Sequence, residues 1–147
     1  MLLDKENQFS DAQTVTTGSD TGVASTNVID FGSARDIGAG KNLYIVVNCV
    51  TATTDAGNNS TLEVRTQTDD NESFSSATNT AVVGTFPVNS AIGTKLVARI
   101  DPGMFNERYG RLLYISANGA LSTGAFDAHI IETPDVYTMY PDAITIS

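Results

Sequence analysis

Residues 61–68 read T-L-E-V-R-T-Q-T, and in this stretch the apolar and polar side chains alternate. Leu62 and Val64 fall on one side of the alternation, and Glu63 and Arg65 fall on the other. Because successive side chains of a strand point to opposite faces, this pattern predicts a half-buried β-strand. The D-D-N cluster that follows is typical of a turn and predicts where the strand ends.

Seven further segments also fit short strands, and no segment shows a sustained apolar stripe at helical spacing. The 19 threonines favour pleated strands, and the 12 glycines favour tight corners. An immunoglobulin-like sandwich is disfavoured because the chain has no Trp and no pair of Cys. We therefore predict an all-β fold, an eight-stranded antiparallel jelly-roll sandwich. The seven segments are 12–17, 27–31, 43–50, 81–88, 95–100, 111–117 and 125–132, of which 43–50 and 111–117 are apolar on both faces and should lie centrally.

The two ends of the chain differ from this body. We predict an N-terminal arm at 1–11, a jelly-roll domain at 12–133 and a C-terminal arm at 134–147. Both arms carry large apolar residues, which are costly to leave exposed, so we expect them to contact another molecule. The alternative is that the arms pack on their own sandwich and cover a sheet edge. The proposed anchors are Leu2, Leu3, Phe9, Tyr137, Met139 and Tyr140.

Composition excludes several classes of function. The chain has 147 residues, with 8 Lys and Arg against 17 Asp and Glu, for a net charge of −9. This balance argues against nucleic acid and against anionic membranes as partners. No apolar run is long enough to span a bilayer, and the first residues show no secretory signal, so we expect synthesis in the cytoplasm of a host cell. One Cys and one His leave no disulfide framework and no multi-His metal site, so we expect no cofactor and no enzyme activity.

The single Cys and the single His are the only nucleophile and base worth weighing. Cys49 lies in an apolar strand and is interpreted as a small buried hydrophobe. His129 lies two residues from Asp127, so an Asp–His pair on one face is conceivable. Since no serine motif accompanies it, a core or surface histidine is the preferred interpretation.

Three other motifs have both a functional and a structural interpretation. The acids at 69–72 could attract Ca²⁺, but their spacing does not match an EF-hand, and a solvated turn is simpler. The G-A-G-K stretch at 38–41 lacks the spacing of a phosphate loop and is interpreted as a corner. Arg108 and Arg111 flank a Tyr-Gly pair; they could bind acids of a neighbouring subunit or form local salt bridges at a strand entry.

Several segments together resemble a known family. They are the opening MLLDKENQFSDAQTVT, residues 27–32 followed by ARDIGAGKNLYIVV, then QTDDNESFSSAT, and finally RYGRLLYISANGALSTGAFDAHII. The pattern covers residues 1 to 133 and is similar to the capsid cement (decoration) proteins of short-tailed phages of the Bordetella-phage type.

The resemblance implies a jelly roll without enzyme activity that binds the outer surface of a phage head. Its partners would be an HK97-like major capsid protein and further copies of itself, with a homodimer favoured and a trimer possible. Its location would be the virion. The rival hypothesis is a carbohydrate-binding β-sandwich of a tail fibre or a glycan-processing protein. Such modules commonly stack sugars on Trp, which this chain lacks, while a cupin-type enzyme would need more than one His.

Overall fold

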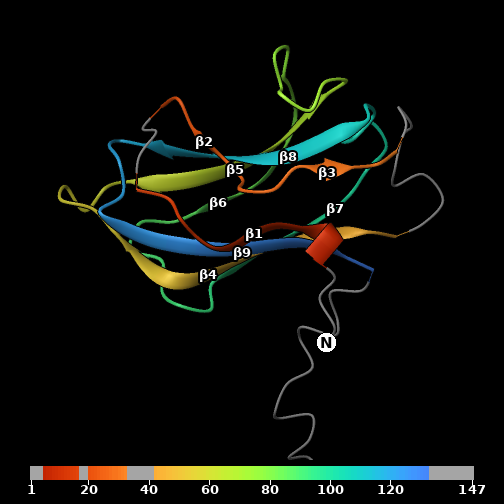
Figure 1. Ribbon diagram of the computed structural model, residues 1–147. Coiled ribbons are helices and arrows are strands. Elements are labelled where there is room, and N and C mark those ends of the chain that lie inside the picture. The colour runs from red at the N-terminus through yellow and green to blue at the C-terminus, as the bar shows by residue number, and fades with distance from the viewer. Residues whose placement is uncertain (1–4, 17–19, 33–41, 133–147) are drawn as a thin grey trace, which may run out of the picture.

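Two stacked sheets make up the body of the protein in the computed structural model, which describes residues 5–16, 20–32 and 42–132 (Figure 1). A short 3-10 helix at Lys5–Asn7 is the only helix of these residues. No helix in the described ranges is long and apolar enough to cross a membrane. The strands are β1 Gln8–Thr14, β2 Val23–Ala24, β3 Ile29–Asp30, β4 Tyr44–Thr54, β5 Thr61–Asp69, β6 Thr78–Phe86, β7 Lys95–Arg99, β8 Tyr109–Ala117 and β9 Thr123–Ile131.

The order of the strands is that of a jelly roll. One sheet has the order β1-β9-β4-β7, and the other has β2-β8-β5-β6 with β3 also paired to β8. Every pairing is antiparallel. The chain crosses between the sheets at each connection except β2–β3 and the β5–β6 hairpin, which is the double Greek-key pattern. The predicted all-β sandwich is confirmed.

The structure has nine strands where eight were predicted, because one edge position is shared by two short strands. Both β2 and β3 pair with β8, at Leu113–Tyr114 and at Tyr109–Gly110. Between them the chain turns toward the other sheet, and the amide of Asn27 donates to the carbonyl of Phe9 at 2.9 Å. This excursion breaks the edge strand in two.

The first strand begins earlier than predicted. The expected strand at 12–17 is replaced by β1, in which Gln8 pairs with His129 and Ser10 with Ala128 of β9. The sheet therefore starts inside the stretch that was predicted to be an N-terminal arm. Phe9, predicted to be an anchor for another molecule, is 0% exposed. This prediction is corrected at Phe9, because the ring packs inside the domain against Phe105, with ring centroids 6.0 Å apart.

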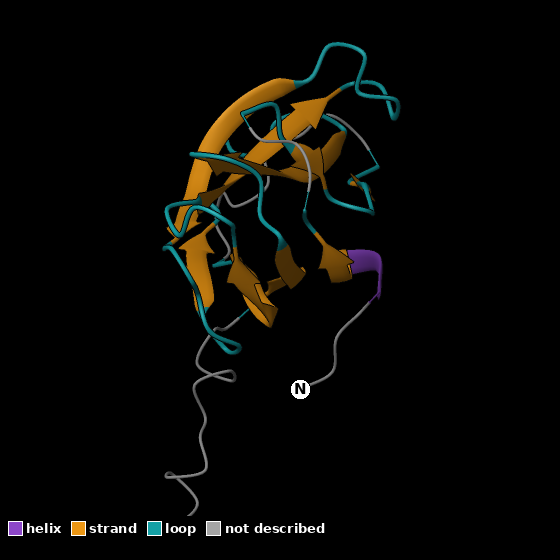
Figure 2. Ribbon diagram, turned by 90° about the vertical axis from the view of Figure 1, so that its left-hand side faces the viewer, coloured by secondary structure: helices purple, strands orange, loops and turns teal. Residues whose placement is uncertain are grey.

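Aromatic rings fill the space between the sheets. Phe126 of β9 contacts Phe86 of β6 at 4.9 Å and Tyr114 of β8 at 5.7 Å, measured between ring centroids. The two-faced strands β4 and β8 each lie between two neighbours, as predicted, since only an interior strand buries both of its faces. Figure 2 shows the strands curving around this core, with loops at their ends.

One buried polar contact joins the two sheets. The hydroxyl groups of Tyr114 and Ser10 lie 2.8 Å apart, and both residues are 0% exposed. We predict that Tyr114→Phe lowers the free energy of unfolding by about 1 kcal/mol, because Ser10 loses one buried partner while the ring still fills its space. Denaturant titration measures the change, with the partly exposed Tyr109→Phe on the same strand as the control. Equal stability of both variants would contradict the assignment.

Candidate interaction surface

One side of the sandwich is closed by the chain itself. The residues between β2 and β3 lie along the outer edge of β1, where Asn27 binds the Phe9 carbonyl. The side chain of Gln13 donates to the carbonyl of Ala24 at 2.8 Å and accepts from the amide of Thr26 at 2.8 Å. These bonds occupy polar groups that an end strand would otherwise present to solvent. We call this the closed side.

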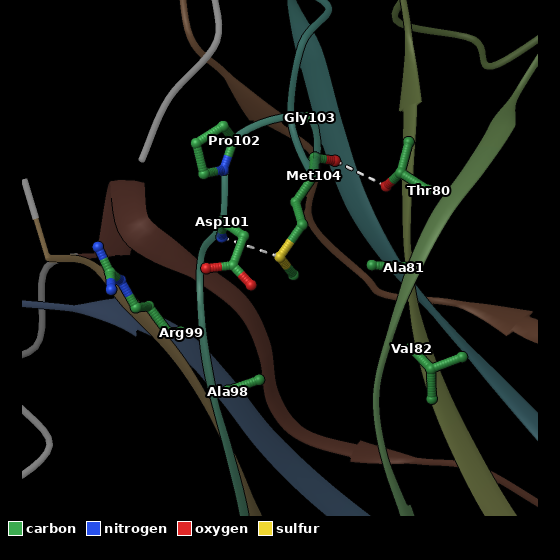
Figure 3. Close-up of a pocket in the computed structure, with 9 residues that line it drawn as sticks. All are labelled: Thr80, Ala81, Val82, Ala98, Arg99, Asp101, Pro102, Gly103 and Met104. Carbon is green, nitrogen blue, oxygen red and sulfur yellow. Dashed lines mark hydrogen bonds between the residues drawn. The ribbon is translucent and has the colours of Figure 1, made fainter. Parts of the chain in front are cut away.

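The opposite side is formed by β6 and β7, the end strands of the two sheets, and by residues 87–94 and 101–104. We call it the open side. An open groove of about 460 Å³ runs between the two strands (Figure 3). Across it, the hydroxyl group of Thr80 donates to the carbonyl of Met104 at 2.7 Å. Gly84 lets the strands approach, since a Cβ at this position would lie 3.1 Å from the side chain of Leu96. The groove is lined by Thr80, Ala81, Val82, Ala98, Arg99, Asp101, Pro102, Gly103 and Met104.

The exposed apolar side chains all gather on the open side. Among the described residues, three large hydrophobic residues are exposed: Val82 of β6 at 53%, Ile92 of the β6–β7 loop at 70%, and Val97 of β7 at 46%. Single exposed apolar residues are ordinary, but their restriction to one side is not. This side is therefore the candidate interaction surface.

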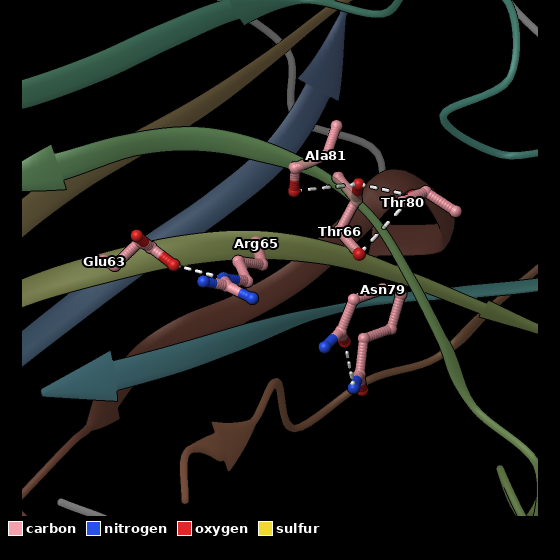
Figure 4. Close-up of polar contacts among 7 residues, drawn as sticks. Glu63, Arg65, Thr66, Asn79, Thr80 and Ala81 are labelled. Carbon is pink, nitrogen blue, oxygen red and sulfur yellow. Dashed lines mark hydrogen bonds and ion pairs between the residues drawn. The ribbon is translucent and has the colours of Figure 1, made fainter. Parts of the chain in front are cut away.

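Cationic side chains border the groove in a chain that is otherwise acidic. Lys95 and Arg99 lie at the two ends of β7, and Arg65 of β5 lies beside β6. Arg65 is bound by Glu63 on its own strand (Figure 4). Three of the eight Lys and Arg residues of the chain thus surround this side.

The two end strands differ in regularity. The pairing of β6 with β5 shifts register twice, so that Val83 and Thr80 are extra residues without a direct partner. The hydroxyl groups of Thr80 and Thr66 meet at 2.7 Å at one shift, and Gln67 donates to Asn79 at 2.7 Å beside it (Figure 4). By contrast, all five residues of β7 pair with β4 in one continuous register. Bulges twist an edge away from further pairing, so β7 is the better template for an added strand.

The predicted arginine site is engaged within the chain. Arg108 binds Asp30 of β3 through two bonds of 2.9 and 3.0 Å, and its guanidinium lies 5.1 Å from the centroid of the Tyr109 ring. The bond from Arg108, followed by that from the Gly32 amide, lowers the pKa of Asp30 to about 2. Arg111 lies 4.1 Å from the centroid of the Phe74 ring and donates to Gln67 at 2.8 Å. Of the two interpretations, the local one describes these contacts.

The remaining predicted interface residues cannot be placed. Leu2, Leu3, Tyr137, Met139 and Tyr140 lie outside the described residues, as do the corner at 38–41 and the arms at 1–4 and 133–147.

The candidate nucleophile and base lie in the interior. Cys49 is 0% exposed, burial raises the pKa of its thiol, and the thiol donates to the Thr51 carbonyl at 3.1 Å, so its interpretation as a buried hydrophobe is confirmed. His129 is 2% exposed, and burial lowers its pKa. Asp127 accepts a bond from the backbone amide of Ala12.

The acidic turn after β5 is organised by Asp69. Its carboxylate accepts from the amides of Asn71 at 3.0 Å and Ser76 at 2.8 Å and from the Ser76 hydroxyl at 3.1 Å. Desolvation opposes the charged form, but these bonds outweigh it and lower the pKa of Asp69. Within the described ranges, no group of three or more His, Cys, Asp or Glu side chains could hold a metal ion.

The fold and the open side together define a jelly-roll module with a surface for binding, and comparison with known proteins places it more closely. A family model, Bbp16, matches residues 9–130, so the chain belongs to the Bbp16 family. The name points to a protein of a Bordetella phage, which agrees with the resemblance found in the sequence and suggests a structural protein of a phage. No curated protein matches the chain.

The role of Asp69 can be tested through stability. We predict that Asp69→Ala lowers the free energy of unfolding at pH 7 by about 1–2 kcal/mol, because two turn amides lose their acceptor. Since the pKa of Asp69 is lowered by folding, this contribution is present above the unfolded pKa of about 3.9 and is lost as the pH falls below it. Thermal unfolding from pH 7 to pH 2 measures the difference, which should shrink at acid pH. The exposed neighbour Asp70→Ala serves as the control, and an equal loss there would contradict the assignment.

Proposed function

We propose that this protein is a capsid cement protein. It binds the outer surface of a phage head built from an HK97-like major capsid protein, and it stabilises the shell by bridging neighbouring capsomers. The observation that carries the proposal is the gathering of every exposed large apolar residue of the described chain on one side of a sandwich that belongs to a phage family.

A rigid body suits this task better than a flexible one. Bridging resists the outward pressure of a filled head only if the bridging element does not stretch, and a sandwich with a packed aromatic core meets that need. Each contact can be weak, because many copies attach to one lattice and further copies of the chain link them. A homodimer is the favoured assembly unit, and a trimer is the alternative.

The proposal also sets what the protein does not need. It performs no reaction and uses no cofactor, and its partners are the shell protein and itself rather than nucleic acid or membrane. It is made in the cytoplasm of the host cell and ends on the outside of the virion.

Ile92 is the side chain best placed to enter a pocket of the partner. It lies at the tip of a turn in which the amide of Thr94 donates to the carbonyl of Ala91 at 3.1 Å. The next residue, Gly93, has a φ of +92° and donates to the carbonyl of Cys49 at 2.8 Å, which ties the turn to β4. A side chain held in place before binding loses little conformational entropy when it is buried.

Sedimentation with capsids that lack the protein tests the proposal. The wild-type chain should sediment with the capsids and raise the temperature at which they release their contents. Ile92→Asp should weaken binding by about tenfold or more while leaving the melting temperature of the free domain unchanged, because a charge replaces a buried apolar anchor. Ala120→Asp, which places the same charge at another exposed loop position, should bind like wild type.

Two results would contradict the proposal. Wild-type protein that stays in the supernatant with intact capsids would remove the function. Equal binding by wild type and Ile92→Asp would leave the function but remove this residue from the contact.

A further inference from the structure

We infer that residues 136–140 of this chain, V-Y-T-M-Y, pair with β7 of the same chain as a fifth strand of its sheet. They would cover the free edge of β7 and fill the groove on the open side. The stretch 133–147 lies outside the described residues, and the argument uses its sequence and the point from which it leaves β9. The inference goes beyond the proposed function and does not depend on it.

The edge of β7 is arranged to receive a strand. The amide of Ile100 donates to the carbonyl of Leu43 at 2.8 Å, and the register then alternates along β4. In an antiparallel pair, every second residue points its N–H and C=O groups away from the partner strand. These groups of Val97 and Arg99 therefore point to the open side, where no described strand pairs with β7.

A second copy of β7 does not fit this edge. Two-fold antiparallel pairing centred on Val97 would place Lys95 of each copy opposite Arg99 of the other. Like charges directly opposite each other destabilise a strand pair. The edge therefore calls for a strand of different composition, apolar on one face and without cations.

The C-terminal segment has that composition. Its 15 residues include Asp135 and Asp142 and no Lys or Arg. Five residues, 136–140, stand between Asp135 and Pro141, and β7 also has five residues, Lys95–Arg99. Because Pro has no N–H to donate, Pro141 ends any pairing where β7 itself begins.

The same chain can reach this edge. Ile131 of β9 pairs with Tyr44 of β4, and Tyr44 pairs with Arg99 of β7, so the three residues lie side by side across the sheet. A position beyond Arg99 is three strand spacings from Ile131, or about 14 Å. Five residue steps from Ile131 to Val136 span about 16 Å when extended. The segment then runs back along β7 and is antiparallel to it.

This register places each side chain in a suitable environment. Residues opposite each other share a face, so Thr138 faces outward beside Val97. Tyr137 and Met139 lie opposite Ala98 and Leu96, whose side chains are partly buried, and enter the groove beside Val82. A shift of one residue would send Thr138 into the groove and both apolar side chains into solvent.

Disulfide trapping in the full-length chain tests the pairing. Val97→Cys with Thr138→Cys, in a Cys49→Ala background, should form a disulfide within one chain under mild oxidation, because directly opposite strand residues have a suitable Cα separation. Mass spectrometry without reduction detects it. Asp11→Cys with Thr138→Cys, which places the first thiol on β1 at the other edge of the sheet, is the control.

The trapping experiment can overturn the inference in three ways. These are no disulfide in the Val97 pair, a disulfide between two chains, or equal trapping in the Asp11 control. None of these results bears on whether the wild-type protein binds capsids, so the two proposals fail separately.

Amide hydrogen exchange needs no cysteines and gives a second test. In the unmodified chain the amide of Val97 should be protected, and Thr138→Pro should speed its exchange by about tenfold or more, because Pro removes a ladder donor. Thr145→Pro, beyond the pairing stretch, should leave that rate unchanged. Exchange of Val97 in the unmodified chain at the rate of an unstructured peptide would overturn the inference.

Discussion

The backbone polar groups at the ends of its two sheets are the constraint on which the rest of this structure depends. A sandwich has four end strands, and each must meet water, a partner or another part of its chain. On one side the chain solves this itself, because residues 24–27 leave β8, bind β1 and break the edge strand into β2 and β3. On the other side, β6 is protected only by its bulges and β7 only by its terminal charges.

This asymmetry connects the fold with the proposed role. The closed side offers no exposed large apolar residue among those described, whereas the open side carries Val82, Ile92 and Val97. A strand laid along β7 would account for Val82 and Val97 and would leave Ile92, at the tip of its turn, for a neighbouring molecule. In this account the chain completes its own sandwich first and then presents one rigid apolar contact to the shell.

The sequence predicted what depends on local pattern and missed what depends on distant partners. Alternation predicted β5 and β7, two-faced runs predicted that β4 and β8 are central, and both are confirmed. The burial of Phe9 depends on Phe105, and the fate of Arg108 depends on Asp30; such contacts between residues far apart in the chain leave no periodic signal. The exposure of Val82 and Ile92 was also missed, since in sequence they are indistinguishable from core residues. The only available signal, the absence of charge along β6, required knowing that β6 lies at an edge.

Electron cryomicroscopy of capsids decorated with the purified protein is the most direct test of the central claim that the open side is the binding side. The account predicts that each copy faces its neighbour or the shell with the β6–β7 loop, with Ile92 in the contact, and that residues 24–28 of the closed side face solvent. A decorated shell in which the closed side makes the contact and Ile92 stays exposed would contradict it.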